Sequence, residues 1–252
     1  MTLYLIGLGL GDEKDITLKG LEAIKRCERV YVEGYTSLLQ CSIQDLEKLY
    51  GKKVIVHHRE GIEHQGDDIV KEARTKDVAV LIIGDVFGAT THWDLFMRAK
   101  EQKVKVEVIH NTSILTAVGD TGLQLYKFGR VVSIPFPQKE WIAETPYTML
   151  KENRAQGLHT LFLLDLDPKS NKFMTIKDAL KIVERLEADK KEGVIDDEAI
   201  FIGCARLGTH TAVIKAGSLK DVANYDFGKP PHCLIVPGRM HFMEEEALQL
   251  WK

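Results

Sequence analysis

Near its start the chain reads Leu3-Tyr4-Leu5-Ile6-Gly7-Leu8-Gly9-Leu10-Gly11-Asp12, an apolar run followed at once by three glycines. The apolar run predicts a buried strand, and the glycines predict a backbone that turns sharply or closely approaches another group. Asp15 stands where a helix N-cap belongs, and a second strand is predicted at 29–33. This β-loop-α-β opening predicts a parallel sheet with a ligand near the carboxyl end of the strand.

The glycines resemble the G-x-G-x-x-G fingerprint of nicotinamide-binding proteins, but the fingerprint fails at one position. Residue 12 is Asp, and its carboxylate would repel a pyrophosphate. Glu33 lies about twenty residues farther on, where a ribose-binding acid is expected. A Rossmann-type oxidoreductase that uses NAD therefore stays the alternative hypothesis, beside a simpler reading in which the glycines only form a tight turn.

Composition narrows the class of protein. The chain has 252 residues, of which 44% are hydrophobic and 28% charged, and its net charge of −3 gives no basic field for nucleic acid. No apolar run is long enough to cross a membrane. The chain begins without a charged-then-apolar leader, and its four scattered cysteines indicate free thiols in a reducing compartment. We therefore expect a cytoplasmic protein.

Strands and helices alternate through the first half of the chain, which predicts a doubly wound sheet in an α/β domain covering residues 1–128. A change of pattern predicts a second α/β domain with a mixed sheet at 129–252, and a ligand cleft between the two domains. The further strands are predicted at 54–56, 78–83, 104–109, 131–134, 159–166, 199–205, 211–216 and 232–236. The further helices are predicted at 67–76, 95–103 after a capping box at Thr91, 114–126, 147–156, 175–191 and 241–251.

Four loops have the composition of a ligand site, and three of them follow strands of the predicted parallel sheet: 7–12, 84–91, 110–114 and 205–208. Asp85 either accepts hydrogen bonds from a ligand or serves only as a turn residue. Gly88 likewise either contacts a ligand or serves only as a turn residue. Ser113 is expected to cap a helix. His57, His58 and His64 lack the spacing of metal ligands, so no metal is expected.

The loops taken together resemble the diphthine synthase family of methyltransferases, within the tetrapyrrole methylase-like superfamily, over the whole chain. The resemblance rests on six segments in order: 3–12 with 15–21, 31–37, 84–92 with 94–95, 110–114 with 122–126, 205–208, and 230–236. It implies two α/β domains, a homodimer, and S-adenosylmethionine bound in the cleft. By matching positions it implies that the cofactor contacts Leu10, Asp85, Gly88, Ser113, Ile114, Leu164, Leu207 and His232.

The resemblance also implies a reaction: repeated methylation of a 3-amino-3-carboxypropyl-histidine on translation elongation factor 2. Each step is a displacement at a methyl carbon that mainly requires alignment and an unprotonated amine, and water can take the proton, so no catalytic residue is assigned. Asp120 and Val86 depart from the family pattern, and the number of methyl groups transferred, three or four with a methyl ester, stays open. A binding module without turnover is the remaining alternative.

Overall fold

The computed structural model describes residues 1–34, 37–57, 59–139, 141–168, 170–196 and 198–252, with the side chains of 59–65 left out. It divides into two compact units, Met1–Ala117 and Val118–Lys252. The segment 118–128, placed by the sequence analysis in the first domain, hydrogen bonds with the end of the chain. The Gln124 N–H donates to Glu244, and the Trp251 indole donates to the carbonyl of Thr121 at 3.1 Å.

The first unit is built on a parallel sheet in the order β3-β2-β4-β1-β5, which confirms the predicted parallel arrangement. Its strands are β1 (Thr2–Gly7), β2 (Arg29–Glu33), β3 (Ile55–His57), β4 (Val78–Ile82) and β5 (Lys105–Ile109). Its helices are α1 (Leu18–Arg26), α2 (Ile43–Tyr50), α3 (Arg59–Glu72), α4 (Trp93–Glu101) and α5 (Ile114–Ala117).

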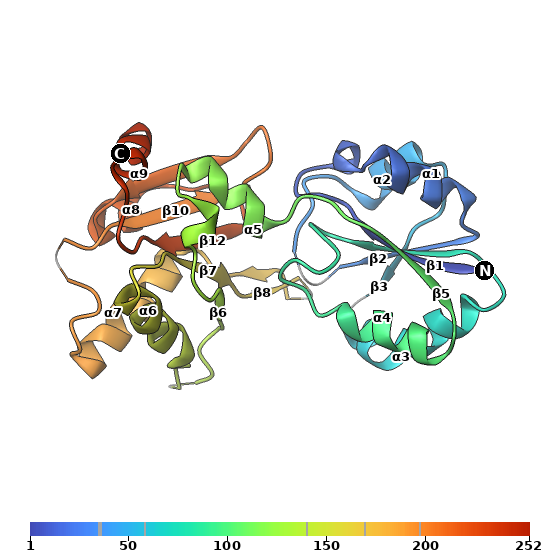
Figure 1. Cartoon of the computed structure of the whole chain (residues 1–252), viewed down its shortest axis with the longest axis horizontal. Helices are drawn as coiled ribbons and strands as arrows, with labels where there is room; N and C mark the ends of the chain where they lie inside the picture. The colour runs from blue at the N-terminus through green and yellow to red at the C-terminus, as the bar shows by residue number, and fades with distance from the viewer. Residues whose placement is uncertain (35–36, 58, 140, 169, 197) are drawn as a thin grey trace. The chain divides into compact units, whose positions relative to one another are not determined.

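Alternate side chains of the central strands fill two separate cores, because both faces of a parallel sheet are covered by helices. Tyr4 and Ile6 of β1 pack toward α1 and α2, whereas Leu3 and Leu5 pack toward α3 and α4. The two helix pairs lie on opposite faces of the sheet (Figure 1). The first unit is therefore doubly wound, as predicted.

Helix starts were the least accurate predictions. Asp15 does not cap α1: it ends a short 3-10 turn, η1 (Glu13–Asp15), and Thr17 is the N-cap, accepting the Gly20 N–H at 3.0 Å. The capping box predicted at Thr91 is also wrong, because α4 begins at Trp93 after His92 without a side-chain cap. The acidic side chain expected in that box, Asp94, instead pairs with Arg98 at 2.8 Å.

The helix predicted over 114–126 is broken, and the one predicted at 67–76 begins earlier, with α3 at Arg59. After the single turn of α5 the chain continues as η2 (Val118–Thr121) and η3 (Leu125–Lys127). Gly122 between them has φ +87°, and a Cβ there would meet that of Ala247 at 2.4 Å. This close packing and left-handed backbone account for the break.

The second unit contains a mixed sheet in the order β11-β10-β12-β7-β6, as predicted. In this sheet β6 pairs with β7 in parallel, whereas β12 pairs antiparallel with β7 and β10, and the pairing of β10 with β11 is antiparallel, as expected. The strands are β6 (Val132–Ile134), β7 (Thr160–Leu164), β10 (Phe201–Ala205), β11 (Val213–Gly217) and β12 (His232–Val236), with a small ribbon of β8 (Leu166–Asp167) and β9 (Lys172–Phe173).

One core fills the space between this sheet and its helices, with Phe162, Phe201 and Leu234 on the sheet side. The helices of the unit are α6 (Thr145–Ala155), α7 (Ile176–Lys190), α8 (Leu219–Asn224) and α9 (Phe242–Leu248), which continues as η4 (Gln249–Trp251). The predicted cap of α7 is confirmed: Thr175 and Asp178 form a capping box.

A buried carboxylate fixes α9 to the segment 124–128. Glu244 is fully buried, accepts hydrogen bonds from Gln124 N–H and His159 Nε2 at 2.9 Å, and pairs with Lys127. His159 Nδ1 accepts the Gly238 N–H at 3.0 Å, so its proton is on Nε2. Every strong acceptor in the cluster therefore has a partner, which is the condition for a stabilising buried charge.

Within the part of the chain that the structure describes, no helix combines the length and the apolar character needed to cross a bilayer.

We predict that Glu244→Gln lowers the free energy of unfolding by about 3 kcal/mol at pH 7, because it leaves the largely buried Lys127 without its counter-charge. Burial opposes ionisation of Glu244, but the hydrogen bonds from Lys127, Gln124 and His241 prevail and lower its pKa to about 2. Its stabilisation is therefore complete above about pH 4.5 and is lost as the pH falls toward 2.

Urea denaturation of the wild type and the variant at pH 7 and pH 3 measures both effects, and the difference between them should shrink at pH 3. Glu245→Gln, an exposed neighbour on the same helix, is the control and should change stability by no more than about 0.5 kcal/mol. A difference that stays constant with pH would contradict the assignment of the effect to the Glu244 charge.

Candidate functional site

Three loops of the first unit meet over the carboxyl end of β1. They follow β1, β4 and β5, which are neighbours in the sheet, so the parallel arrangement places all three loops at the same edge. The missing side chain of Gly7 makes room for them: a Cβ there would lie 2.7 Å from the carbonyl oxygen of Gly84 and 2.8 Å from the Cβ of Asn111. The close approach predicted from the glycine run is confirmed.

Gly9 and Gly84 then join the first two loops through a pair of backbone hydrogen bonds. The Gly9 N–H donates to Gly84 at 3.1 Å, and the Gly84 N–H donates back at 2.8 Å. Both residues have left-handed backbones, with φ of +80° and +83°. Only glycine adopts this conformation without strain, so the spacing of these glycines is a structural requirement of the site.

Asn111 connects the third loop to the first and was not singled out from the sequence. Its side-chain amide donates to the carbonyls of Gly7 and Asp15, each at 3.0 Å, and its Oδ1 accepts the Thr112 N–H. The position of an Asn two residues after a strand of a parallel sheet was the available signal. Asp15, wrongly expected as a helix cap, accepts the Gly11 N–H at 2.7 Å in the same cluster.

Asp85 connects the second loop to the third. Its Oδ1 accepts the Phe87 N–H at 3.0 Å, and its Oδ2 accepts the Asn111 N–H at 3.1 Å and contacts His110 Nδ1 at 2.8 Å. Burial alone would raise the pKa of Asp85, but these hydrogen bonds outweigh it and hold the pKa below its ordinary value. The carboxylate is therefore charged at neutral pH and organises two loops.

The other predicted residues of the first unit lie around this cluster. Gly88 packs against Ser113 so closely that a Cβ would lie 2.4 Å from the Ser113 hydroxyl. Ser113 is buried and accepts the Leu115 N–H at 3.2 Å, as a helix-capping residue does, while Ile114 begins α5. Leu10 lies beside Gly84. The structure thus brings Asp85, Gly88 and Ser113 together at one edge of the sheet.

The three predicted residues of the second unit share one edge of its sheet. His232 begins β12 and is paired with Ala205, the last residue of β10, and the next residue pairs with Leu163 of β7. Leu164 therefore ends β7 beside the start of β12, and buried Leu207 follows β10 by two residues. The register alone gathers these residues, although they are separated by up to 68 positions in the sequence.

His232 has a buried acceptor atom. Its Nε2 contacts the carbonyl of Lys229 at 3.2 Å and so carries the proton. Its Nδ1 is buried and, among the described residues, forms no hydrogen bond. Burial lowers the pKa of His232, so the ring is neutral at physiological pH. A bound molecule with N–H or O–H donors would satisfy this nitrogen.

Arg206 fixes the loop that carries Leu207 and was missed in the sequence. Its guanidinium donates to Thr211 at 3.1 Å, to the carbonyl of Phe227 at 2.8 Å, and to that of Lys229. Its backbone is left-handed at φ +51°, an uncommon conformation for a residue with a side chain. No local sequence pattern signals the contacts with Phe227 and Lys229, because these residues are 21 and 23 positions away.

Glu33 favoured a nicotinamide cofactor in the sequence. In the structure its side chain is buried and bound to other groups of the protein. Its Oε1 accepts the Ile83 N–H at 3.0 Å, and its Oε2 lies 3.3 Å from Nε2 of buried His92. It therefore has no exposed face for a ribose. Of the histidines weighed as metal ligands, His58 and the side chain of His64 lie outside the described residues, and the described residues contain no group able to hold a metal.

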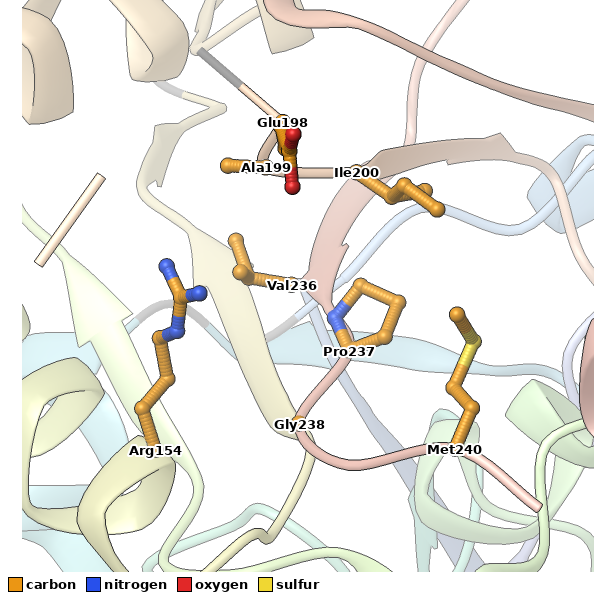
Figure 2. A pocket seen from close by; sticks show the side chains of 8 residues that line it. All are labelled: Arg154, Glu198, Ala199, Ile200, Val236, Pro237, Gly238 and Met240. Atoms are coloured by element: carbon orange, nitrogen blue, oxygen red, sulfur yellow. The ribbon is translucent and has the colours of Figure 1, made fainter. Parts of the chain in front are cut away.

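The second unit also contains a hollow, and Figure 2 shows the side chains that line it. It is lined by Arg154, residues 198–200, residues 236–238 and Met240. Val236 ends β12, whereas His232 begins it, so the hollow lies at the opposite end of the sheet. The Arg154 guanidinium is already bound to the carbonyl of Val194 and to Asp196. The hollow is therefore not part of the candidate site.

Comparison with known proteins identifies relatives that match nearly the full length of the chain. The family model described as Tetrapyrrole (Corrin/Porphyrin) Methylases matches residues 2–223. A protein named diphthine synthase from Methanocaldococcus jannaschii is 46% identical, with 98% of this chain and 97% of the relative covered. A human protein named diphthine methyl ester synthase is 44% identical, with 99% and 94% covered.

A solved structure that resembles this chain carries the same name as its sequence relatives. A crystal structure titled diphthine synthase superposes with a TM-score of 0.91 at 37% identity, covering 100% of this chain and 96% of that chain. Its likeness therefore extends over both units, and the fold expected from the resemblance is confirmed.

We predict that Gly7→Ala destabilises the first unit by about 2 kcal/mol and weakens ligand binding, because the new Cβ would push the loops after β4 and β5 apart. Chemical denaturation measures the stability. Gly66→Ala in α3 is the matched control, since its Cβ would meet atoms no closer than 3.7 Å, and Ala should stabilise the helix slightly. Equal stability of the two variants would disprove the close approach over β1.

Proposed function

The chain belongs to the tetrapyrrole (corrin/porphyrin) methylase family, and from this premise we propose that it methylates the modified histidine of translation elongation factor 2. Its relatives are diphthine synthases, and the chain is an S-adenosylmethionine-dependent methyltransferase of diphthamide biosynthesis. The observation that carries the proposal is the meeting of Asp85, Gly88 and Ser113 at the carboxyl edge of the parallel sheet, where such sheets bind ligands.

We propose that S-adenosylmethionine contacts Leu10, Asp85, Gly88, Ser113 and Ile114 of the first unit and Leu164, Leu207 and His232 of the second. The chemistry of these residues fits the molecule. His232 offers a buried acceptor without a partner to its N–H and O–H groups. The leucines offer apolar surface to adenine. Gly88 lets Ser113 pack directly against the loop after β4, because a Cβ at Gly88 would lie 2.4 Å from the Ser113 hydroxyl.

Charge supports the same cofactor. When bound, S-adenosylmethionine supplies a methyl group on a cationic sulfur, and a nearby carboxylate is compatible with that charge. Asp12 and Asp85 would instead repel the pyrophosphate of NAD. Asp12 accepts the Lys14 N–H at 2.9 Å and remains partly exposed. The chain's own role in the transfer is to hold the acceptor nitrogen in line with the methyl carbon, so that the two reactants do not adopt orientations from which displacement is impossible.

The acceptor we propose is the 3-amino-3-carboxypropyl group on a histidine of elongation factor 2, which the names of the relatives support. Its nitrogen takes up methyl groups until it is a quaternary ammonium, and its carboxylate is the position for a methyl ester. We further propose that the protein acts as a homodimer in the cytoplasm, where this acceptor is found.

We predict that S-adenosylmethionine, or its demethylated product, raises the melting temperature, whereas NAD does not. Ligand at a hundred times its dissociation constant adds about 2.7 kcal/mol to the free energy of unfolding. Differential scanning fluorimetry with each compound measures the shift. Stabilisation by NAD alone would overturn the cofactor assignment and restore the oxidoreductase hypothesis.

Incubation with S-adenosylmethionine should increase the mass of elongation factor 2 that carries the partly built side chain. Mass spectrometry counts the transferred methyl groups, and fragmentation distinguishes those on nitrogen from one on the carboxylate. Elongation factor 2 with an unmodified histidine is the control and should keep its mass. Cofactor binding without any mass increase would indicate a binding module rather than an enzyme.

A further inference from the structure

His110 and Asp85 form an oriented pair at the edge of the sheet where the three loops meet. His110 directly follows β5, Asp85 follows β4, and the strand between them is β1. Nδ1 of His110 lies 2.8 Å from Oδ2 of Asp85. The Asp85 side chain is 14% exposed, whereas that of His110 is 66% exposed. The pair therefore has a sheltered carboxylate and an accessible ring.

The orientation of the ring follows from the partners of Asp85. Two backbone N–H groups hold the carboxylate in place and in its charged form, so it acts as an acceptor toward His110. The proton of neutral His110 is therefore on Nδ1, and the lone pair of Nε2 is available. Among the described residues no hydrogen bond to Nε2 is formed. The ring of Phe87, 6.1 Å away and nearly edge-on, packs against the imidazole.

A histidine with a structural role is held differently in the same chain. His159 is fully buried, its Nδ1 accepts the Gly238 N–H, and its Nε2 donates to Glu244. Both nitrogens of His159 are used by the protein. In His110 one nitrogen is held by a charged carboxylate and the other faces solvent, which is the arrangement of a histidine that exchanges protons with a substrate.

We propose that His110 is the general base that removes a proton from the substrate's amino group before methyl transfer, with Asp85 as its positioning residue. This inference rests on the proposed function and assigns a catalytic residue to it. The amine arrives largely as an ammonium ion, which has no lone pair for attack. Asp85 holds the imidazole in the tautomer and orientation that present Nε2 to the substrate, and its carboxylate pairs with the imidazolium that results.

Nε2 of His110 takes a proton from the ammonium, leaving a neutral amine and an imidazolium paired with Asp85. The nitrogen lone pair forms a bond to the methyl carbon, the carbon–sulfur bond breaks, and its electrons stay on sulfur, giving a neutral thioether. The imidazolium releases its proton to water. The first and second products again carry a proton on nitrogen and need His110, whereas the quaternary ammonium carries none.

Methyl transfer to the carboxylate oxygen can be compared with methyl transfer to nitrogen in the same enzyme. A carboxylate is ionised at neutral pH, so its oxygen attacks without losing a proton and needs no base. Loss of His110 should therefore slow transfer to nitrogen and spare transfer to oxygen. A role of His110 in cofactor binding or in folding would instead slow both transfers to the same degree.

The test compares wild type with His110→Asn on two acceptors: elongation factor 2 carrying the primary amine, and elongation factor 2 already carrying the trimethylated side chain with a free carboxylate. At pH 7 we expect transfer to nitrogen to fall about 100-fold or more. Ester formation and the dissociation constant of S-adenosylmethionine should change less than about threefold. The loss on nitrogen should diminish as the pH rises, because the amine then loses its proton to water.

His241→Asn is the matched control, since His241 is an exposed cap of α9 and Asn is a favoured cap, so both transfers should continue at the wild-type rate. His110→Gln, which keeps a donor for Asp85, is the second variant and must show the same split between nitrogen and oxygen. Equal losses on both acceptors, or no loss on nitrogen, would overturn the inference. Wild type inactive on both acceptors would instead refute the proposed function.

Discussion

The site depends on the absence of a side chain at the end of β1. Gly7 lies between two strands whose following loops must touch, and the carbonyl of Gly84 and the side chain of Asn111 occupy the space that a Cβ would need. Because that space is free, the carboxylate of Asp85 reaches the backbone and ring of the loop after β5. The positions of Gly88, Ser113 and His110 all follow from this contact.

In the second unit, the predicted contact residues and α9 are held in place by strand register and by buried charged groups. Antiparallel pairing of β12 with β10 and β7 gathers Leu164 and His232 at one edge, and Arg206 holds the loop of Leu207 through distant carbonyls. Glu244 fastens α9 to the segment that precedes β6. Each unit thus has its own hydrophobic packing, with two cores in the first and one in the second, and its own means of fixing the predicted contact residues.

Predictions from the sequence were most accurate for features that are determined by residues close together in the chain. Strand β12 was predicted at its observed bounds, and the capping box at Thr175 was correct, because both follow from nearest neighbours in the chain. The cap at Asp15 was wrong, since its carboxylate serves the loop of Gly11 instead of a helix. Asp85 contacts His110, 25 residues away, and Glu33 accepts the Ile83 N–H, 50 residues away, and no local pattern shows such pairs.

The parallel arrangement of the first sheet has an evolutionary consequence. The connections that enter β4 and β5 lie at the opposite edge from the loops that leave β4, β1 and β5. Insertions and deletions in those entering connections can accumulate among descendants without moving Asp85 or His110. Lengthening of the loops that leave the strands has no such freedom, because backbone hydrogen bonds join Gly9 and Gly84 and the Asn111 N–H donates to the Asp85 side chain. Drift in chain length within this lineage should therefore be concentrated on one side of the sheet.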